Sequence, residues 1–188
     1  PVGVVVTNLD ASVSVGGNAH ITANSADLSA LATVTSVIKT MSLAPPGTPV
    51  DGAVAVSTVD SNASVSIGAN ARFDVTDALA LDAENDVSVV ANATPATAAF
   101  GISVAVGVID ATTSATIDGN ARVATGSLAV NATTTTDATV TAAASEDGGG
   151  APQQGDVAKS ILDDDRYKAG TSTSEGGVSV VGGFAITD

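Results

Sequence analysis

The chain has 188 residues, of which 20 are acidic and 6 are basic, so its formal net charge is −14, and it contains no cysteine. This charge disfavours binding to nucleic acid or anionic membranes, because few side chains can replace the counterions of phosphate groups. The lack of cysteine excludes disulfides, thiolate metal sites and cysteine nucleophiles. Hydrophobic residues make up 44% and aromatic residues only 2%, so the core must consist of Ala, Val, Ile and Leu, which favours β-structure with narrow, uniform spacing.

The chain opens with a run in which every second residue is apolar. Residues 4–34 read VVVTNLDASVSVGGNAHITANSADLSALATV, with Ser, Thr, Asn and Asp between many of the apolar positions. This alternation predicts strands with one buried face. No apolar stretch reaches the roughly 20 residues that a membrane-spanning helix needs, so we expect no membrane insertion by this segment.

The same pattern returns twice after a Pro-rich break at residues 42–49, in residues 54–93 and 104–143. In each repeat an Asp closes an apolar run, and an Asn lies in a small turn of sequence GGNA, GANA or DGNA. These marker residues are Asp10, Asp60, Asp110, Asn18, Asn70 and Asn120. The residue two positions after each Asn is His20, Arg72 or Arg122. The repeats therefore span approximately residues 1–50, 51–100 and 101–143.

Each repeat is predicted to contain about five short strands of roughly five residues. In the second repeat, small polar clusters at residues 68–70, 76–77 and 84–86 separate the apolar runs. Gly, Asn and Asp tolerate the positive φ angles of tight turns, so we interpret these clusters as turns.

Residues 144–176 do not alternate and are dominated by Gly, Ser, Pro, Gln and Asp. We expect them to form a flexible acidic and Gly-rich insertion that loops out on one side of the fold. Residues 177–188 return to the alternating pattern and begin a fourth repeat.

A repeat of about 50 residues with the same turn residues in the same place favours a solenoid over a sandwich or a closed barrel. We predict an all-β fold, a parallel β-helix in which identical positions stack about 4.8 Å apart. Because a coil of three short strands needs about 25 residues, we expect two coils per repeat. A wider, two-sheet array similar to immunoglobulin domains is the competing architecture.

The runs GISVAVGVID and ATIDGNARVATGSLAVNA, with the variants IGANARFDV and SEGGVSVVGGFAITD, resemble the repeats of giant adhesins of Gram-negative bacteria, of the filamentous-haemagglutinin-like and LEPR-XLL types. The resemblance covers nearly all of the chain outside the insertion. It implies a long, cysteine-poor protein, secreted or held at the cell surface, that acts in adhesion, biofilm cohesion or fibre formation. It transfers no catalytic residue, and the calcium-binding nonapeptide of repeat-in-toxin proteins is not present.

The marker residues have two interpretations each. Stacked Asp10, Asp60 and Asp110 could bind a divalent cation, because like charges about 5 Å apart repel, but an Asp that closes a strand through a turn is the favoured interpretation. Asn18, Asn70 and Asn120 could form a stacked amide ladder for a ligand, but turn residues in the left-handed conformation are favoured.

Calcium is the one cofactor that the sequence suggests, with weak ligands at Asp163, Asp164 and Asp165 in the insertion, near Glu146 and Asp156. Carboxylates on a flexible loop suit Ca²⁺, although the spacing matches no EF-hand and a solvated loop is the favoured interpretation.

His20 is the single histidine, which excludes a two-His metal site, and we expect it to be exposed. A threonine run resembles part of an ice-binding array and consists of Thr133 to Thr136, with Thr139 and Thr141. The aligned residues of the second repeat are Glu84, Asn85 and Asp86, so the threonines do not recur from repeat to repeat.

The sequence predicts no catalytic residue, no bound organic cofactor and no enzyme activity. We expect a structural or adhesive segment of a surface filament, located outside a bacterial cell, which associates with itself end to end or laterally and which contacts glycans or proteins of a host or neighbouring cell. A β-helical carbohydrate-active enzyme, or a module that binds carbohydrate or ice, is the alternative.

Overall fold

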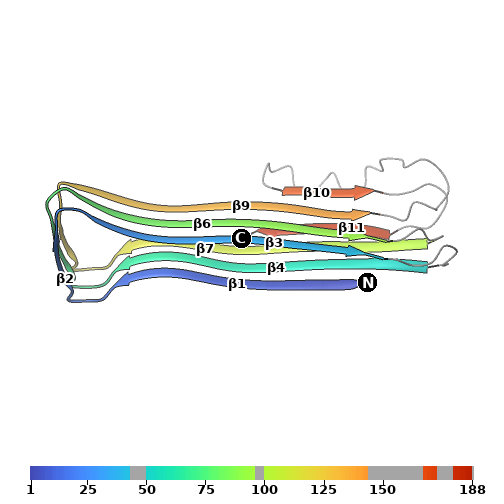
Figure 1. Cartoon of the computed structure of the whole chain (residues 1–188), viewed down its shortest axis with the longest axis horizontal. Helices are drawn as coiled ribbons and strands as arrows, with labels where there is room; N and C mark the ends of the chain where they lie inside the picture. Colours follow the sequence, from blue (N-terminus) through green and yellow to red (C-terminus); the bar gives the residue numbers. More distant parts are fainter. Residues whose placement is uncertain (43–49, 96–99, 144–166, 173–179, 188) are drawn as a thin grey trace.

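A computed structural model of the chain describes residues 1–42, 50–95, 100–143, 167–172 and 180–187. Within these residues the chain forms three successive coils, each made of a long strand, a short strand and a second long strand (Figure 1). The coils consist of β1 (Val2–Val15), β2 (His20–Ala23) and β3 (Ala26–Met41); β4 (Val50–Ile67), β5 (Arg72–Val75) and β6 (Ala78–Thr94); and β7 (Phe100–Ile117), β8 (Arg122–Ala124) and β9 (Ser127–Ala143).

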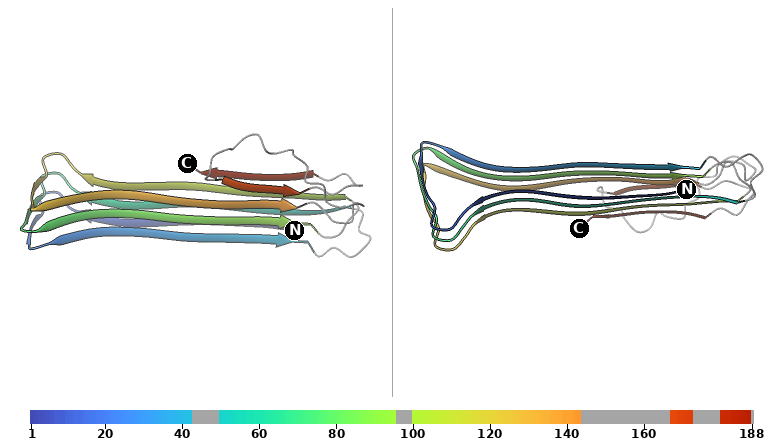
Figure 2. Two further views of the ribbon diagram at one scale, coloured as in Figure 1. Left: turned by 90° about the horizontal axis from the view of Figure 1, so that it is seen from above. Right: turned by 60° about the horizontal axis from the view of Figure 1, so that its bottom comes forward.

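Corresponding strands of successive coils pair in parallel and form three sheets. Sheet A has the order β1-β4-β7-β11, sheet B the order β2-β5-β8, and sheet C the order β10-β9-β6-β3, with β10 (Tyr167–Ser172) and β11 (Val180–Thr187). Sheets A and C lie as two layers, joined at one end by the narrow sheet B (Figure 2). The predicted all-β parallel solenoid is therefore confirmed.

The predicted number of coils is wrong: each repeat forms one wide coil, not two. Arg72 pairs with His20 of the preceding coil and with Arg122 of the following coil, so one full repeat separates adjacent rungs. The expected five short strands are replaced by two strands of 14 to 18 residues and one of 3 or 4 residues. The clusters at 68–70 and 76–77 are turns as predicted, but residues 84–86 lie inside β6.

The core lies between the inner faces of sheets A and C. Inward positions of coil 2 alternate strictly with outward positions, and most are fully buried because coils 1 and 3 cover both edges. Small residues such as Ala53 and Ala55 belong to one apolar cluster with Val87 and Val89. A second cluster near sheet B holds Phe73, the largest fully buried side chain. A two-layer core of this thickness is filled by small and β-branched side chains, as the composition predicts.

Polar side chains also lie in this core, and each finds a partner. Asn85 is fully buried and accepts a hydrogen bond from Ser61 Oγ at 2.7 Å, while its Nδ2 donates to the carbonyl oxygens of Ser61 at 2.9 Å and Thr112 at 3.2 Å. Ser36 and Ser57 share a hydrogen bond of 2.8 Å between their hydroxyls. These bonds join sheet C to sheet A across the core and avoid the cost of unpaired buried polar groups.

Residues 167–172, inside the segment expected to loop out, instead form β10, which pairs in parallel with residues 138–143 of β9. Strand β11 pairs with β7, with Val180 opposite Ile102 and Thr187 opposite Ile109. It therefore begins a fourth coil in register with the third, in agreement with the fourth repeat expected at residues 177–188.

Candidate functional site

The three marker asparagines are turn residues, as predicted. Asn18, Asn70 and Asn120 have φ angles of 65°, 61° and 66°. Each is the third residue of a β-turn, in which the amide of the next residue donates to the carbonyl two residues before the Asn, as in Ala71 N to Gly68 O at 3.2 Å. Asn accepts this left-handed conformation more readily than most residues, and the three turns direct the chain from sheet A into sheet B.

The marker aspartates do not close strands, so the predicted turn role of Asp10, Asp60 and Asp110 is wrong. All three are exposed and lie inside β1, β4 and β7. Asp60 is paired with Asp110, but Asp10 is paired with Asn62, whose Nδ2 donates to Asp10 Oδ1 at 3.1 Å. The three aspartates therefore do not form one column: Asp60 and Asp110 are aligned with Asn8, and Asp10 is aligned with Asn62 two residues farther along the strands.

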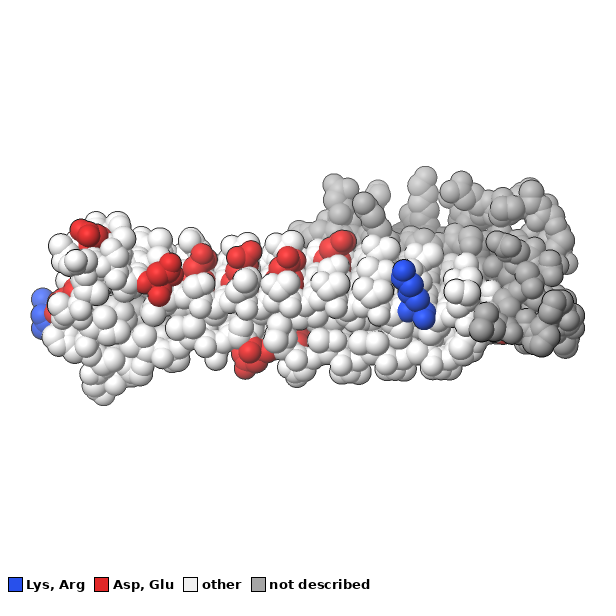
Figure 3. Space-filling view, in the orientation of Figure 1, with Lys and Arg blue, Asp and Glu red and all other residues white. Residues whose placement is uncertain are grey.

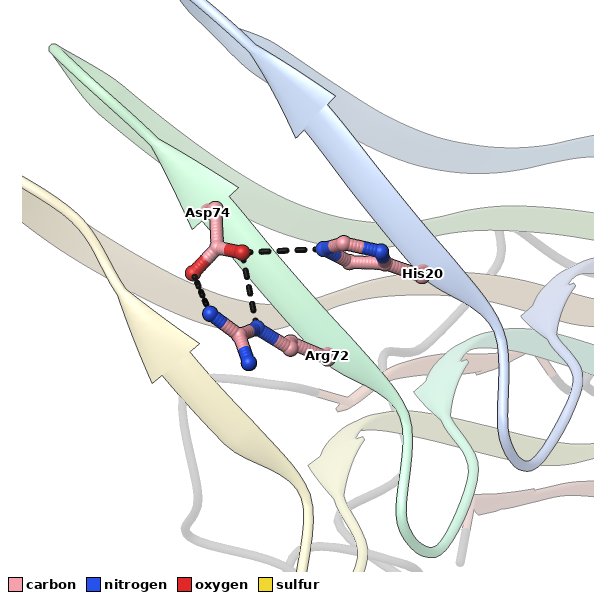
Figure 4. Close-up of polar contacts among 3 residues, drawn as sticks. All are labelled: His20, Arg72 and Asp74. Carbon is pink, nitrogen blue, oxygen red and sulfur yellow. Dashed lines mark hydrogen bonds and ion pairs between the residues drawn. The ribbon is translucent and has the colours of Figure 1, made fainter.

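The narrow edge of the molecule carries an exposed ion-pair cluster on sheet B (Figure 4). Asp74 accepts hydrogen bonds from Arg72 Nε at 2.7 Å and Arg72 Nη2 at 3.2 Å, and His20 Nε2 lies 2.9 Å from Asp74 Oδ2. Arg72 and Asp74 come from β5, whereas His20 comes from β2, so the cluster links two coils. His20 is exposed and aligned with Arg72 and Arg122, as the sequence predicts.

These contacts shift the pKa values of both partners within β5. The hydrogen bonds from Arg72 and then from His20 hold the pKa of the Asp74 carboxyl below its usual value. The pKa of Arg72 is raised, because Asp74 accepts its hydrogen bonds and carries the opposite charge. The Arg72–Asp74 pair is exposed, and exposed pairs of this kind contribute little to stability.

The outer face of sheet C carries a line of carboxylates that the sequence analysis does not identify (Figure 3). Alternate outward positions of β6 supply the three central members, β3 supplies one end and β9 the other. The line consists of Asp27, Asp82, Glu84, Asp86 and Asp137. The sequence signal is the alternation Asp-x-Glu-x-Asp at 82–86, which places three carboxylates on one face of a strand.

The threonine run does not form an array. Thr133 and Thr135 are paired with Glu84 and Asp86, as the sequence alignment predicts, so acidic residues interrupt the outward columns. Thr134 shares a hydrogen bond of 2.6 Å with Thr113 of β7.

The predicted calcium ligands Asp163, Asp164 and Asp165, with Glu146 and Asp156, lie outside the described residues. Among the residues that the structure describes, no group of three or more His, Asp or Glu side chains is arranged to hold a metal ion. The described part of the chain also contains no helix that is long and apolar enough to cross a membrane.

The described surfaces offer charge and hydrogen bonding on flat, rigid faces. They include an acidic line on sheet C, an ion-pair cluster on sheet B and unpaired strand edges at the end of the stack formed by coil 1. Such features suit recognition of, or association with, other molecules. Comparison of the chain with protein-family models, with curated proteins and with solved structures finds no match.

Proposed function

We propose that this chain is a structural and adhesive segment of a stacked β-solenoid that acts on the outside of a bacterial cell. The observation that carries the proposal is the residue-for-residue stacking of successive coils, which β11 continues into a fourth coil. A fold in which each coil is the template for the next suits extension into a long body. The resemblance of its repeats to those of giant bacterial adhesins supports the same role.

End-to-end association would use the open strand edges. Strands β1, β2 and β3 each lie at the end of their sheet, so coil 1 presents three unpaired edges among the described residues. Backbone groups at such an edge readily pair with another strand. At the opposite end β10 and β11 cover part of coil 3, and β8 remains the terminal strand of sheet B.

The geometry of the coil sets the shape of such a body. The longest strands contain 18 residues, which corresponds to a width of roughly 60 Å, while each coil adds only about 4.8 Å along the stacking axis. A stacked assembly would therefore be a wide, flat ribbon, whose length increases by only about 4.8 Å for each coil of about 50 residues. Its outer faces, including the acidic line, are the surfaces available to a glycan or protein of a neighbouring cell.

Negative-stain electron microscopy, with and without calcium, tests the self-association. We expect ribbons about 60 Å wide in the micrographs, and X-ray fibre diffraction of the same ribbons should show a repeat of about 4.8 Å along the ribbon axis. Beads coated with the chain should adhere to bacterial cells more than beads coated with an unrelated acidic protein of equal charge. No cleavage of acidic polysaccharides is expected. Compact particles without adhesion, or depolymerisation of such a polysaccharide, would contradict the proposal.

A further inference from the structure

Strand β10 departs from the order in which the chain builds its coils. In coils 1, 2 and 3 the chain passes from sheet A through sheet B to sheet C. The next described strand after β9 is β10, and it pairs again in sheet C, beside residues 138–143 of the strand just completed. Strand β11 then pairs with residues 102–109 of β7 in sheet A. Two short strands therefore lie on the same end of coil 3, at the end far from sheet B (Figure 1).

These two strands cover only half of coil 3. Where β10 pairs with β9, the inward-facing Val140 is fully buried. In the part of β9 nearer sheet B, Leu128 and Val130 are 49% and 44% exposed, although Val130 pairs with the fully buried Leu81. The apolar interior of coil 3 is thus covered far from sheet B and open near sheet B.

Coil 1 of a second copy fits this end of coil 3 in the register that the internal coils already use. One uniform shift relates all three strands of coil 1 to those of coil 3, through the pairing of both with coil 2. It aligns Val2 with Val104, His20 with Arg122 and Ala26 with Leu128. We call this alignment the shared register. A coil 1 stacked one rung beyond coil 3 meets three strands in the order and register of its own.

The strand carboxylates of the two coils do not meet in this contact, although each chain carries a formal charge of −14. In the shared register each of them lies opposite an uncharged residue. The pairs are Asp10 with Thr112, Asp27 with Ala129, Asn8 with Asp110 and Thr35 with Asp137. By contrast, the internal contact between coils 2 and 3 pairs Asp60 with Asp110. The contact between copies therefore lacks a like-charge pair that the fold itself accepts.

We propose that β10 and β11 form a cap that competes with coil 1 of a second copy for the edges of coil 3. In the shared register β10 occupies the places of residues 36–40 of the incoming β3, and β11 occupies those of residues 2–7 of the incoming β1. One strand edge cannot pair with both. This inference rests on the end-to-end association proposed above and adds its regulation.

The balance between the cap and the incoming coil depends on protein concentration. The cap strands contain 6 and 8 residues, whereas the incoming β3 and β1 contain 16 and 14. The cap has fewer backbone pairs but belongs to the same chain, so its effective concentration is high. The incoming coil docks on the open half of coil 3, and its contact becomes complete only when the cap detaches. Dilute chains therefore stay capped, and concentrated chains stack.

A reversible disulfide tests the cap in the full chain, which has no cysteine of its own. Thr139 pairs with Lys168 of β10 on one side and with Val90 of β6 on the other. The variant Thr139→Cys, Lys168→Cys locks β10 onto β9 when oxidised and frees it when reduced. The matched control Val90→Cys, Thr139→Cys joins β9 to β6 and leaves β10 free.

A second variant, Ala169→Pro, Gly170→Pro, weakens the cap without a crosslink. Amides of consecutive residues point to opposite sides of a strand, so one of the two lost amides faces β9, and proline cannot donate to a sheet. Circular dichroism checks that each variant folds. Analytical ultracentrifugation between about 10 µM and 1 mM measures assembly.

We expect the locked variant to stay monomeric when oxidised and to form open-ended oligomers when reduced, and the control to form oligomers in both states. The proline variant should assemble at a concentration about tenfold lower than the wild type, because more chains have a free coil 3. An oxidised locked variant that assembles as readily as its reduced form would overturn the cap and leave end-to-end stacking intact. If no variant assembles up to about 1 mM, the proline variant included, stacking itself is overturned together with the cap.

Discussion

At the scale of single residues, buried polar side chains in the core connect the two long sheets. Asn85 is fully buried and makes three hydrogen bonds, to the hydroxyl of Ser61 and to the carbonyl oxygens of Ser61 and Thr112. It lies between an apolar cluster that contains Val87 and another that contains Ala83. A satisfied buried amide favours one alignment of the sheets, because any other alignment leaves its donors and acceptors without partners.

We therefore expect Asn85→Ala to lower the free energy of unfolding by about 2–4 kcal/mol, because it creates a cavity and leaves the Ser61 hydroxyl without its acceptor. Urea denaturation measures this change. Asn92→Ala, at an outward position of the same strand, is the control and should cost less than about 0.5 kcal/mol. Adding Ser61→Ala to Asn85→Ala should cost less than the sum of the single changes. Equal small effects of Asn85→Ala and Asn92→Ala would contradict this role for Asn85.

The ion-pair cluster on sheet B makes a second prediction at this scale. An NMR titration should give Asp74 a pKa below the ordinary value of about 3.9 for an aspartate, because Arg72 and His20 donate hydrogen bonds to its carboxylate. A lowered pKa means that the contribution of the pair to stability is present above the ordinary pKa and is lost as the pH falls through the lowered value.

The variant Arg72→Gln should raise the pKa of Asp74 toward its ordinary value. Arg122→Gln removes the same charge from the paired strand β8 and should leave the Asp74 titration almost unchanged. If both variants shift the pKa of Asp74 equally, general charge and not the Arg72 hydrogen bond controls it.

At the scale of strands, the sequence predicts which residues face inward better than it predicts where strands end. The alternation of apolar residues correctly identifies the buried face of β6 and of residues 63–67 in β4. At residues 53–56 both faces of β4 are apolar, and the alternating Val54 and Val56 point outward, while Ala53 and Ala55 are buried. The sequence predicts a turn at the polar cluster 84–86, but Asn85 points inward and finds partners on sheet A, while Glu84 and Asp86 point outward. A hydrogen bond to a strand distant in the sequence makes this cluster part of a strand, and no local pattern reveals that partner.

The turns between sheets A and B also show how one coil restricts the next. A Cβ atom on Gly68 would lie 2.8 Å from the amide nitrogen of Gly17 and 3.0 Å from the carbonyl oxygen of Val15, whereas a Cβ atom on Gly16 would meet nothing within 4 Å. Gly16 and Gly68 occupy the same position of the turn in coils 1 and 2.

Gly68→Ala should therefore destabilise the fold by about 1–3 kcal/mol, because backbone atoms of coil 1 must move. Gly16→Ala should be neutral or stabilise by up to about 1 kcal/mol, because it restricts the unfolded chain. Thermal or urea unfolding of the two variants compares them directly. A Gly68→Ala variant as stable as Gly16→Ala would show that the turns are not closely stacked.

At the scale of the whole molecule, the repeat length predicts a solenoid but not the size of its coil. A repeat of about 50 residues accommodates either two narrow coils or one wide coil, and the choice depends on whether mid-repeat polar residues turn the chain or find partners. The sequence alignment predicts that Asp10 lies beside Asp60, yet Asp10 pairs with Asn62. A shift of two residues keeps every side chain on its face, so alternation alone cannot detect it.

The candidate surfaces were also only partly predictable. The turn asparagines and the exposed His20 follow from local sequence, but the acidic line requires the register between strands about 50 residues apart. The account of shape and association depends on one coil per repeat, because this sets the width of the ribbon and the number of residues between adjacent rungs.

The most direct test of this claim is disulfide formation in the variant Ser64→Cys, Ser114→Cys, since the natural chain has no cysteine. Ser64 and Ser114 are paired on adjacent coils, so their Cα atoms should lie about 4.8 Å apart, within the range for a disulfide. We expect rapid intramolecular disulfide formation under mild oxidation, measured by mass spectrometry, and little in the diagonal control Ser64→Cys, Thr116→Cys. If the two introduced cysteines of the paired variant fail to join in the folded chain, an additional rung separates them by about 9.6 Å, and one wide coil per repeat is contradicted.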